Sequence, residues 1–142
     1  MSARQDSSRT YTGAIDQARG CEALVIPVAG PVRAIELGAV DGDLAMLQEA
    51  VGGFIEALPL PDFIADGDLA TAYVNEEGKL RQLDVNWRAT DFMVPGVGLF
   101  FGDFIAGPMV VAGFNPRTGS HAPLPPAVES RVRLVQREAA GR

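Results

Sequence analysis

The segment at residues 47–62, LQEAVGGFIEALPLPD, constrains the fold most, because it changes secondary structure without a linker. Gly52 and Gly53 follow a helix-like stretch, and glycine adopts the left-handed conformation of a helix C-cap at little cost. Residues 54–58 are apolar apart from one glutamate and predict a strand, which Pro59 ends because proline has no N–H to donate to a sheet. A helix that passes directly into a strand indicates a small α+β domain.

The helix before Gly52 has a predicted beginning as well as a predicted end. Residues 41–43, Asp-Gly-Asp, supply the short polar side chains that are typical of a helix N-cap. Leu44, Leu47 and Val51 are spaced i, i+3, i+7, so we expect them to share the apolar face of this helix.

Apolar runs rich in β-branched residues predict the strands. Pro27 lies inside the first run, so we expect that strand to lie at a sheet edge or to bend there. Gly30-Pro31 and the segment 75–79 are turn signals between runs. The predicted strands cover residues 23–28, 32–37, 54–58, 69–74, 80–83 and 109–113.

The second half of the chain contains two further segments with helical character. Residues 84–90, DVNWRAT, predict either a short helix or an ordered loop. Pro126 suits the first turn of a helix, and Val128, Val132 and Val135 follow it at i, i+4, i+7 along one face.

These elements predict an α+β fold: a small, mostly antiparallel sheet with one central packed helix and a C-terminal helix. We expect a flexible polar tail at residues 1–20, an α+β core domain at residues 21–113, and a loop with the C-terminal helix at residues 114–142.

The charge is concentrated in the middle of the chain. The net charge is −6, but residues 21–113 alone contain four basic and fourteen acidic side chains. Such a region repels nucleic acid, whose affinity for proteins comes mainly from phosphate neutralisation, so we do not expect a nucleic-acid partner.

Composition also limits cofactors and location. One cysteine, Cys21, and one histidine, His121, are too few for a structural zinc site, whereas a magnesium or calcium ion bound by carboxylates is left open because it needs only oxygen ligands. We expect no cofactor and assign no metal-binding residue. No apolar run is long enough to span a bilayer, and no signal-peptide pattern is present, so we expect a cytoplasmic protein without a membrane partner.

Three segments in order carry a family resemblance. They are LQEAVGGFIEALPLPD (47–62), VNEEGKLRQLDVNWRAT (74–90) and DFIAGPMVVAG (103–113). Together they resemble the domain-of-unknown-function family 3846, over about residues 22–113. The resemblance implies a setting in bacteriophages and in bacteria such as actinobacteria, and an antiparallel sheet with one packed helix. It implies no catalytic or binding residues.

The most suggestive group of polar residues is Asn75, Asn86, Trp87 and Arg88. An arginine can grip a phosphate or carboxylate with paired N–H donors, and an indole can stack on a base. Together they would hold a nucleotide or an anionic peptide. The structural alternative is that Asn86 caps a turn, Trp87 fills the edge of the core and Arg88 pairs with an acid.

Other candidates have weaker signals. Glu56 and Asp103 would have to share a metal ion to form a hydrolytic site, and Glu56 alone is typical of a solvent-facing strand position. We expect His121 to be a bystander, because no nucleophile motif accompanies it. The Phe-rich stretch 99–105 predicts either a partner-binding patch or core and dimer packing.

These observations predict a non-enzymatic accessory protein that binds a protein partner, in an anti-defence or regulatory role. The alternative is a domain that binds or sequesters a small ligand or nucleotide through the Asn75, Asn86 and Arg88 region. An enzyme based on Glu56 and Asp103 is a third hypothesis, and homo-oligomerisation is open.

Overall fold

The computed structural model describes residues 20–38, 42–61, 64 and 69–140, with side chains up to Arg137. The predicted N-terminal tail therefore lies outside the described residues, apart from Gly20. In the described part of the chain, six strands form one sheet in which every pairing is antiparallel. The strands are β1 (Cys21–Ile26), β2 (Arg33–Leu37), β3 (Ile55–Pro59), β4 (Ala70–Asn75), β5 (Met109–Asn115) and β6 (Ser120–Ala122).

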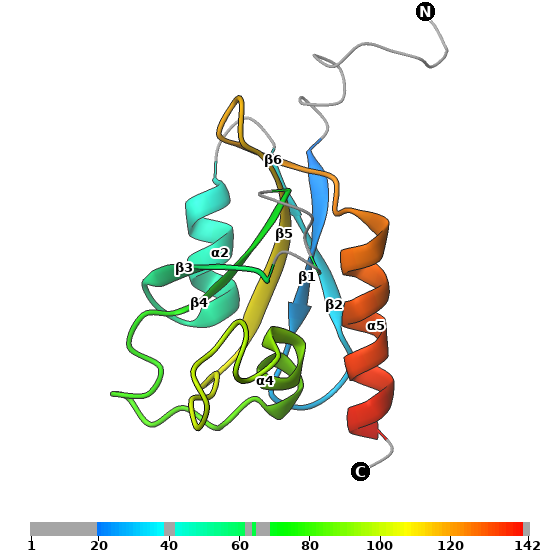
Figure 1. The fold of residues 1–142 in the computed structure, drawn as a ribbon. Helices are drawn as coiled ribbons and strands as arrows, with labels where there is room; N and C mark the ends of the chain where they lie inside the picture. Colours follow the sequence, from blue (N-terminus) through cyan, green and yellow to red (C-terminus); the bar gives the residue numbers. More distant parts are fainter. Residues whose placement is uncertain (1–19, 39–41, 62–63, 65–68, 141–142) are drawn as a thin grey trace, which may run out of the picture.

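The strand order is β2-β1-β5-β4-β3, with β5 at the centre (Figure 1). Gly113 of β5 pairs with Ala70 of β4 on one side and with Ala122 of β6 on the other. The short strand β6 therefore lies on the same side of β5 as β1. The strand β3 pairs only with β4 and is the edge strand at the end of this order opposite to β2.

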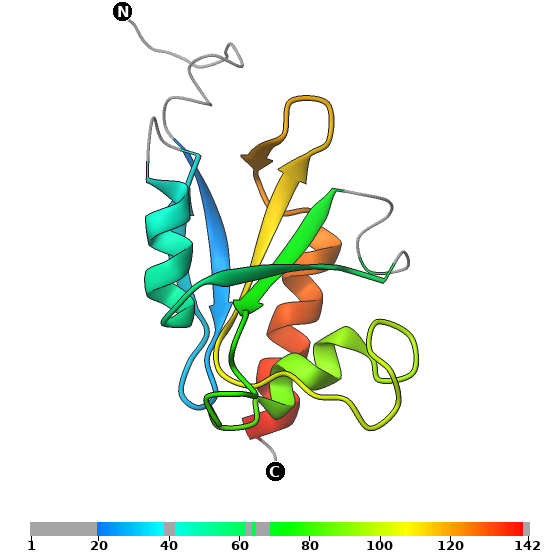
Figure 2. The same ribbon diagram turned by 90° about the vertical axis from the view of Figure 1, so that its left-hand side faces the viewer.

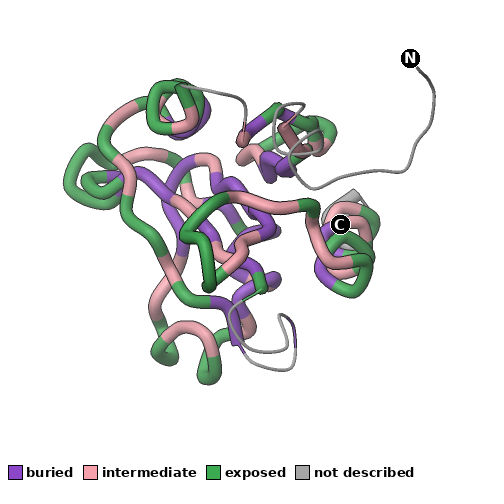
Figure 3. Tube along the Cα trace, turned by 90° about the horizontal axis from the view of Figure 1, so that it is seen from above, coloured by how far each residue is buried: buried purple, intermediate pink, exposed green. Residues whose placement is uncertain are grey.

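Helices cover both faces of this sheet (Figures 1 and 2). The helix α2 (Asp43–Val51) packs on one face, and α4 (Trp87–Met93) and α5 (Pro126–Ala140) pack on the other. Successive side chains of a strand point to opposite faces, so Val110 contacts the α2 side while Val111 contacts the side of α4 and α5. Figure 3 shows the buried residues gathered along the sheet and on the inner sides of the helices.

The α+β class and the antiparallel sheet are confirmed, and the helix stop at Gly52 has the expected geometry. Gly52 has a left-handed φ of 81°, and its N–H donates to the Gln48 carbonyl at 2.8 Å. Leu47 and Val51 are buried as expected, but Leu44 is 57% exposed. The expectation that Leu44 shares the buried face of α2 was therefore wrong.

Three further expectations are corrected or decided. The strand β1 ends at Ile26, before Pro27, and lies between β2 and β5, so it is not an edge strand. Residues 80–83 are not a strand, because turns with local backbone hydrogen bonds, such as Leu83 N–H to the Gly78 carbonyl at 2.9 Å, use the groups that a sheet would need. Residues 84–90 do contribute a helix, which is α4.

The C-terminal helix α5 belongs to the core. Val128, Val132 and Val135 are almost completely buried in the same cluster as Phe92 of α4 and Val111 of β5. The side chain of Gln136 also accepts a hydrogen bond from the backbone of Val32 at 2.6 Å, which ties α5 to the β1–β2 loop. The apolar face that this spacing produces therefore packs against one face of the sheet.

Candidate functional site

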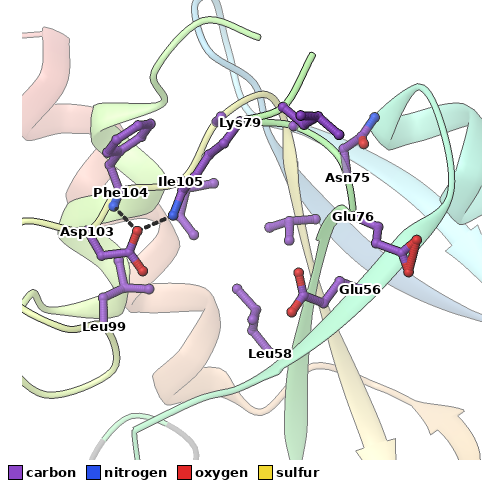
Figure 4. Close-up of a pocket in the computed structure, with 13 residues that line it drawn as sticks. Glu56, Leu58, Asn75, Glu76, Lys79, Leu99, Asp103, Phe104 and Ile105 are labelled. Carbon is purple, nitrogen blue, oxygen red and sulfur yellow. Dashed lines mark hydrogen bonds and ion pairs between the residues drawn. The ribbon is translucent and has the colours of Figure 1, made fainter. Parts of the chain in front are cut away.

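A cavity of about 360 Å³ opens beside the edge strand β3, on the sheet face that carries α4 (Figure 4). We call it the β3 cleft. Its apolar lining includes Leu58 of β3, Val74 of β4 and Ile105. Its walls are the turn after β4, residues 76–80, and the loop before β5, residues 99–106. Edge strand and loops together therefore form one concave surface.

The two walls of the β3 cleft touch each other at one end. A Cβ atom on Gly78 would lie 2.7 Å from the Ala106 carbonyl oxygen, so only glycine allows the backbones to approach this closely. The loop before β5 is also fixed to the chain leading into α4, because Asn86 N–H donates to the Ile105 carbonyl at 2.8 Å. These contacts fix the two walls of the cleft relative to each other and to the start of α4.

Charged groups line the β3 cleft unevenly (Figure 4). Lys79 forms an ion pair with Asp103 and lies 5.0 Å from the centre of the Phe104 ring. The hydrogen bond from Lys79, helped by one from the Phe104 N–H, lowers the pKa of Asp103 below its ordinary value. Among the described residues, neither the Glu56 nor the Glu76 carboxylate has an ion-pair partner. The cleft therefore presents unneutralised negative charge.

Large apolar side chains are exposed in the two loops that form the walls of the β3 cleft, and we call the exposed side chains of Leu80, Phe100 and Phe101 its rim. Leu80 lines the cleft and is 81% exposed, and Phe100 and Phe101, next to the lining residue Leu99, are 86% and 87% exposed. The ring of Phe101 lies over Gly96, where a Cβ atom would come within 2.4 Å of it. The Phe-rich stretch is therefore not core packing at Phe100 and Phe101.

Of the four residues that the sequence singled out, only Asn75 lines the β3 cleft. Its side chain is buried and engaged within the chain. Nδ2 donates to the Val51 carbonyl at 3.1 Å, and Oδ1 accepts from the Glu77 N–H at 2.8 Å. Asn75 thus ties the end of α2 to the turn after β4.

Asn86 is completely buried and caps the helix α4, where the structural alternative expected it to cap a turn. Its Oδ1 accepts from the Ala89 N–H at 3.0 Å. Its Nδ2 donates to the carbonyls of Ile26 at 2.8 Å and Gly107 at 2.9 Å. Both amide hydrogens are therefore used to join α4 to two other parts of the fold.

Arg88 is 7% exposed and binds backbone carbonyls instead of an acid. Its two terminal nitrogens donate to the carbonyls of Gly30 at 2.7 Å and Pro27 at 2.5 Å, and its burial lowers the pKa of the guanidinium. The neighbouring Trp87 is 58% exposed, so it does not fill the edge of the core. Asn86 and Arg88 therefore act here as supports of the fold.

A comparison with models of protein families matches residues 21–136 to the domain of unknown function DUF3846. The chain belongs to this family. The matched part of this DUF3846 chain starts at the first residue of β1 and ends within α5, so it includes the whole sheet, α2, α4 and most of α5. No curated protein and no solved structure gives a significant match.

A polar network of the DUF3846 chain was not foreseen from the sequence. His121 of β6 lies between Asp43, with Nδ1 2.7 Å from Oδ2, and Tyr73, with Nε2 2.8 Å from the hydroxyl. The second oxygen of Asp43 accepts from the Gly38 N–H at 2.7 Å. Tyr73 and Asp43 lie 48 and 78 positions before His121 in the sequence, so no local sequence pattern indicates this network.

Neither Tyr73 of this network nor Cys21 is activated as a nucleophile. Burial, followed by the charge of Asp43, raises the pKa of the Tyr73 phenol. The same two causes, with a further contribution from Glu36, raise the pKa of the Cys21 thiol. Both groups are therefore held in their protonated form, which is the less nucleophilic one.

Metal binding has no support from the described side chains. No group of three or more His, Cys, Asp or Glu residues is arranged to hold a metal ion within the part of the chain that the structure describes. Glu56 and Asp103 both line the β3 cleft, but Glu56 belongs to β3 and Asp103 to the loop before β5, and Figure 4 shows them on opposite sides of the cleft. In the part of the chain that the structure describes, no helix is long and apolar enough to cross a membrane.

Proposed function

We propose that this DUF3846 domain is a non-enzymatic accessory protein that binds another protein at the rim of the β3 cleft. The observation that carries the proposal is the exposure of Phe100 and Phe101, at 86% and 87% of their surface. Exposed aromatic side chains beside a concave surface are typical of interaction sites, where aromatic residues act as anchors.

The backbone of the aromatic loop is fixed by its own hydrogen bonds. Gly96 N–H donates to the Leu99 carbonyl at 2.6 Å, and Asp103 N–H donates to the Phe100 carbonyl at 3.0 Å. A loop fixed in this way loses little conformational entropy when a partner binds. Each phenylalanine ring that a partner covers contributes about 25 cal/mol per Å² of buried apolar surface.

The charge of the domain supports a partner with a basic surface. Residues 21–113 contain ten more acidic than basic side chains, and two of these acids, Glu56 and Glu76, line the β3 cleft. Opposite charge accelerates encounter and discriminates against partners of like charge. The bacteriophage or actinobacterial setting, an anti-defence or regulatory role, and residence in the cytoplasm are part of the same proposal.

The test replaces both rim aromatics, as Phe100→Ser together with Phe101→Ser, and compares capture of proteins from the native host. We expect the wild-type domain to retain a specific partner that the double variant loses. Leu44→Ser is the matched control, because Leu44 is also exposed but belongs to α2 on the opposite face of the sheet. Equal capture by all three proteins would reject the rim as the binding surface.

A second candidate function is binding of a small cationic ligand in the β3 cleft. Its support is that a cavity of about 360 Å³, within the usual size range for ligand sites, contains carboxylates without an ion-pair partner among the described residues. We favour it over the predicted nucleotide site, because Asn75, Asn86 and Arg88 make hydrogen bonds within the chain.

A thermal-shift screen of polyamines and other organic cations tests the second candidate. A ligand that binds the native state must raise the melting temperature. Glu56→Gln should remove that shift, and Glu49→Gln, in the exposed part of α2, should keep it. No shift at millimolar concentration retires this function.

A further inference from the structure

The outer edge of β3 has no strand beside it in the described part of the chain. The Glu76 N–H donates to the Phe54 carbonyl at 2.8 Å, which fixes the pairing phase of β3 against β4. Hydrogen-bonded and non-hydrogen-bonded pairs alternate along antiparallel strands, so the backbone groups of Ile55 and Ala57 point away from β4. The N–H groups of these two residues are therefore available to a further strand.

Pro59 is consistent with this phase. It stands two residues after Ala57, so its nitrogen belongs to the outward-facing set, where the missing N–H breaks no bond to β4. The Pro59 carbonyl faces outward and can still accept. The free edge of β3 thus offers donors at residues 55 and 57 and acceptors at residues 55, 57 and 59.

The side chains of β3 connect this edge to the β3 cleft. Glu56 and Leu58 both line the cleft, while Ile55 packs on the α2 side of the sheet. A strand added next to β3 would place every second side chain on the cleft face, beside Glu56 and Leu58. It would therefore be recognised by its backbone at the edge and by its side chains in the cleft.

The charges decide what kind of segment fits. Lys79 is already paired with Asp103, whereas Glu56 and Glu76 have no ion-pair partner among the described residues. Lysine or arginine side chains on the cleft face would be attracted to these two carboxylates, and acidic ones would be repelled. A second copy of this chain would bring its own Glu56 to the same edge, which opposes pairing of β3 with itself.

We propose that the partner supplies an extended segment with basic side chains, which pairs with β3 as a seventh strand and places those side chains beside Glu56 and Glu76. This inference rests on the proposed function and names the chemistry of its partner. Strand addition to a sheet edge takes its affinity from main-chain hydrogen bonds and its specificity from alternate side chains.

The test uses a synthetic peptide of about seven residues that alternates lysine and valine, so that all lysines share one face of an added strand. Amide hydrogen exchange of the full chain is followed by NMR as the peptide is added. We expect exchange at the Ile55 and Ala57 amides to slow by about tenfold or more at saturation, because their N–H groups become hydrogen bonded. A peptide N-methylated at alternate residues on the edge that faces β3 should give no protection.

Charge variants of the domain provide the second arm. Glu56→Lys together with Glu76→Lys should weaken peptide binding by about tenfold, since two attractive contacts become repulsive. Glu49→Lys on α2 makes the same charge change as each of these substitutions, but on the opposite face, and should leave binding within about twofold, because its charge is distant and screened. Circular dichroism confirms that each variant is folded.

Three outcomes overturn the inference. They are no protection at millimolar peptide, equal binding of a glutamate–valine peptide, and protection of the Ile55 and Ala57 amides that rises with protein concentration alone, which would make a second copy the occupant. Each leaves the proposed function intact if host-protein capture still depends on Phe100 and Phe101. Suppose instead that host-protein capture does not depend on Phe100 and Phe101, while the peptide still protects the Ile55 and Ala57 amides. That result would reject the rim as the binding surface and support the strand site at β3.

Discussion

The imidazole Nδ1 of His121, in β6, lies 2.7 Å from the Asp43 carboxylate at the start of α2. A carboxylate only accepts hydrogen bonds, so Nδ1 carries a proton. In the neutral ring Nε2 then accepts from the Tyr73 hydroxyl at 2.8 Å, and in the charged ring it donates to the same oxygen. Both protonation states keep both bonds, and β6 stays tied to α2 and β4.

We predict that His121→Ala lowers the free energy of unfolding by about 1–3 kcal/mol, because it removes two partly buried hydrogen bonds. Tyr73→Phe should cost about 1 kcal/mol, since it removes only the hydroxyl. Denaturant unfolding of both single variants and the double variant measures the coupling. If the two losses simply add, the hydrogen bond between the residues contributes nothing.

Arg88 should prove to be a structural residue. Arg88→Ala removes the donors that hold the Pro27 and Gly30 carbonyls, and we expect a loss of about 1–3 kcal/mol in the free energy of unfolding. Arg88→Lys should recover part of the loss, because an ammonium reaches one carbonyl but not both with fixed geometry. Chemical denaturation compares the three proteins, with Arg117→Ala in the exposed β5–β6 turn as a control. Unchanged stability of Arg88→Ala would restore Arg88 as a candidate ligand-binding residue.

The C-terminal helix should behave as part of the core. Val132 is fully buried between α5 and the sheet, so Val132→Ala should lower the free energy of unfolding by about 2 kcal/mol. Leu134→Ala, in the same helix but 38% exposed, should change it by less than about 0.5 kcal/mol. Thermal or urea unfolding distinguishes the two. Equal effects would mean that α5 does not pack as described.

The glycine that ends α2 should be needed for its backbone conformation alone. Gly52 has a φ of 81°, and no atom lies within 4 Å of the position that a Cβ atom would take, so Gly52→Ala introduces strain without a clash. We expect a loss of about 1–2 kcal/mol, the usual cost of the left-handed conformation for a residue with a Cβ atom. Gly52→Asn should lose less, because asparagine tolerates this conformation. Equal stability of all three in urea would show that the helix does not end there.

The Lys79–Asp103 ion pair in the β3 cleft predicts how the stability of the domain changes at low pH. The pKa of Asp103 is lowered in the folded protein, so its contribution to stability is complete above its ordinary pKa of 3.8. The contribution is lost as the pH falls through the lower, folded-state pKa. NMR titration of the Asp103 carboxyl group should give a midpoint below 3.8, and Lys79→Gln should move the midpoint back up towards that value. If the Asp103 midpoint were the same in the wild type and in Lys79→Gln, the ion pair would be contradicted.

The sequence by itself determined the features that depend on neighbouring residues. The glycines after Val51 ended α2, the valines of α5 formed its buried face, and the apolar runs predicted β1, β3, β4 and β5 close to their observed bounds. These signals are local because a cap needs one permissive residue and a buried face needs only the right period.

The tertiary structure decided where the polar side chains find their partners and which apolar side chains stay exposed. Arg88 binds carbonyls 58 and 61 residues away, and His121 binds a carboxylate 78 residues away. Leu80, Phe100 and Phe101 look like core residues in the sequence, yet they are exposed in the two loops that form the walls of the β3 cleft, where the backbone makes local hydrogen bonds. The burial of a side chain and its long-range partners depend on how the whole chain packs. The spacing of residues along the sequence therefore does not predict them.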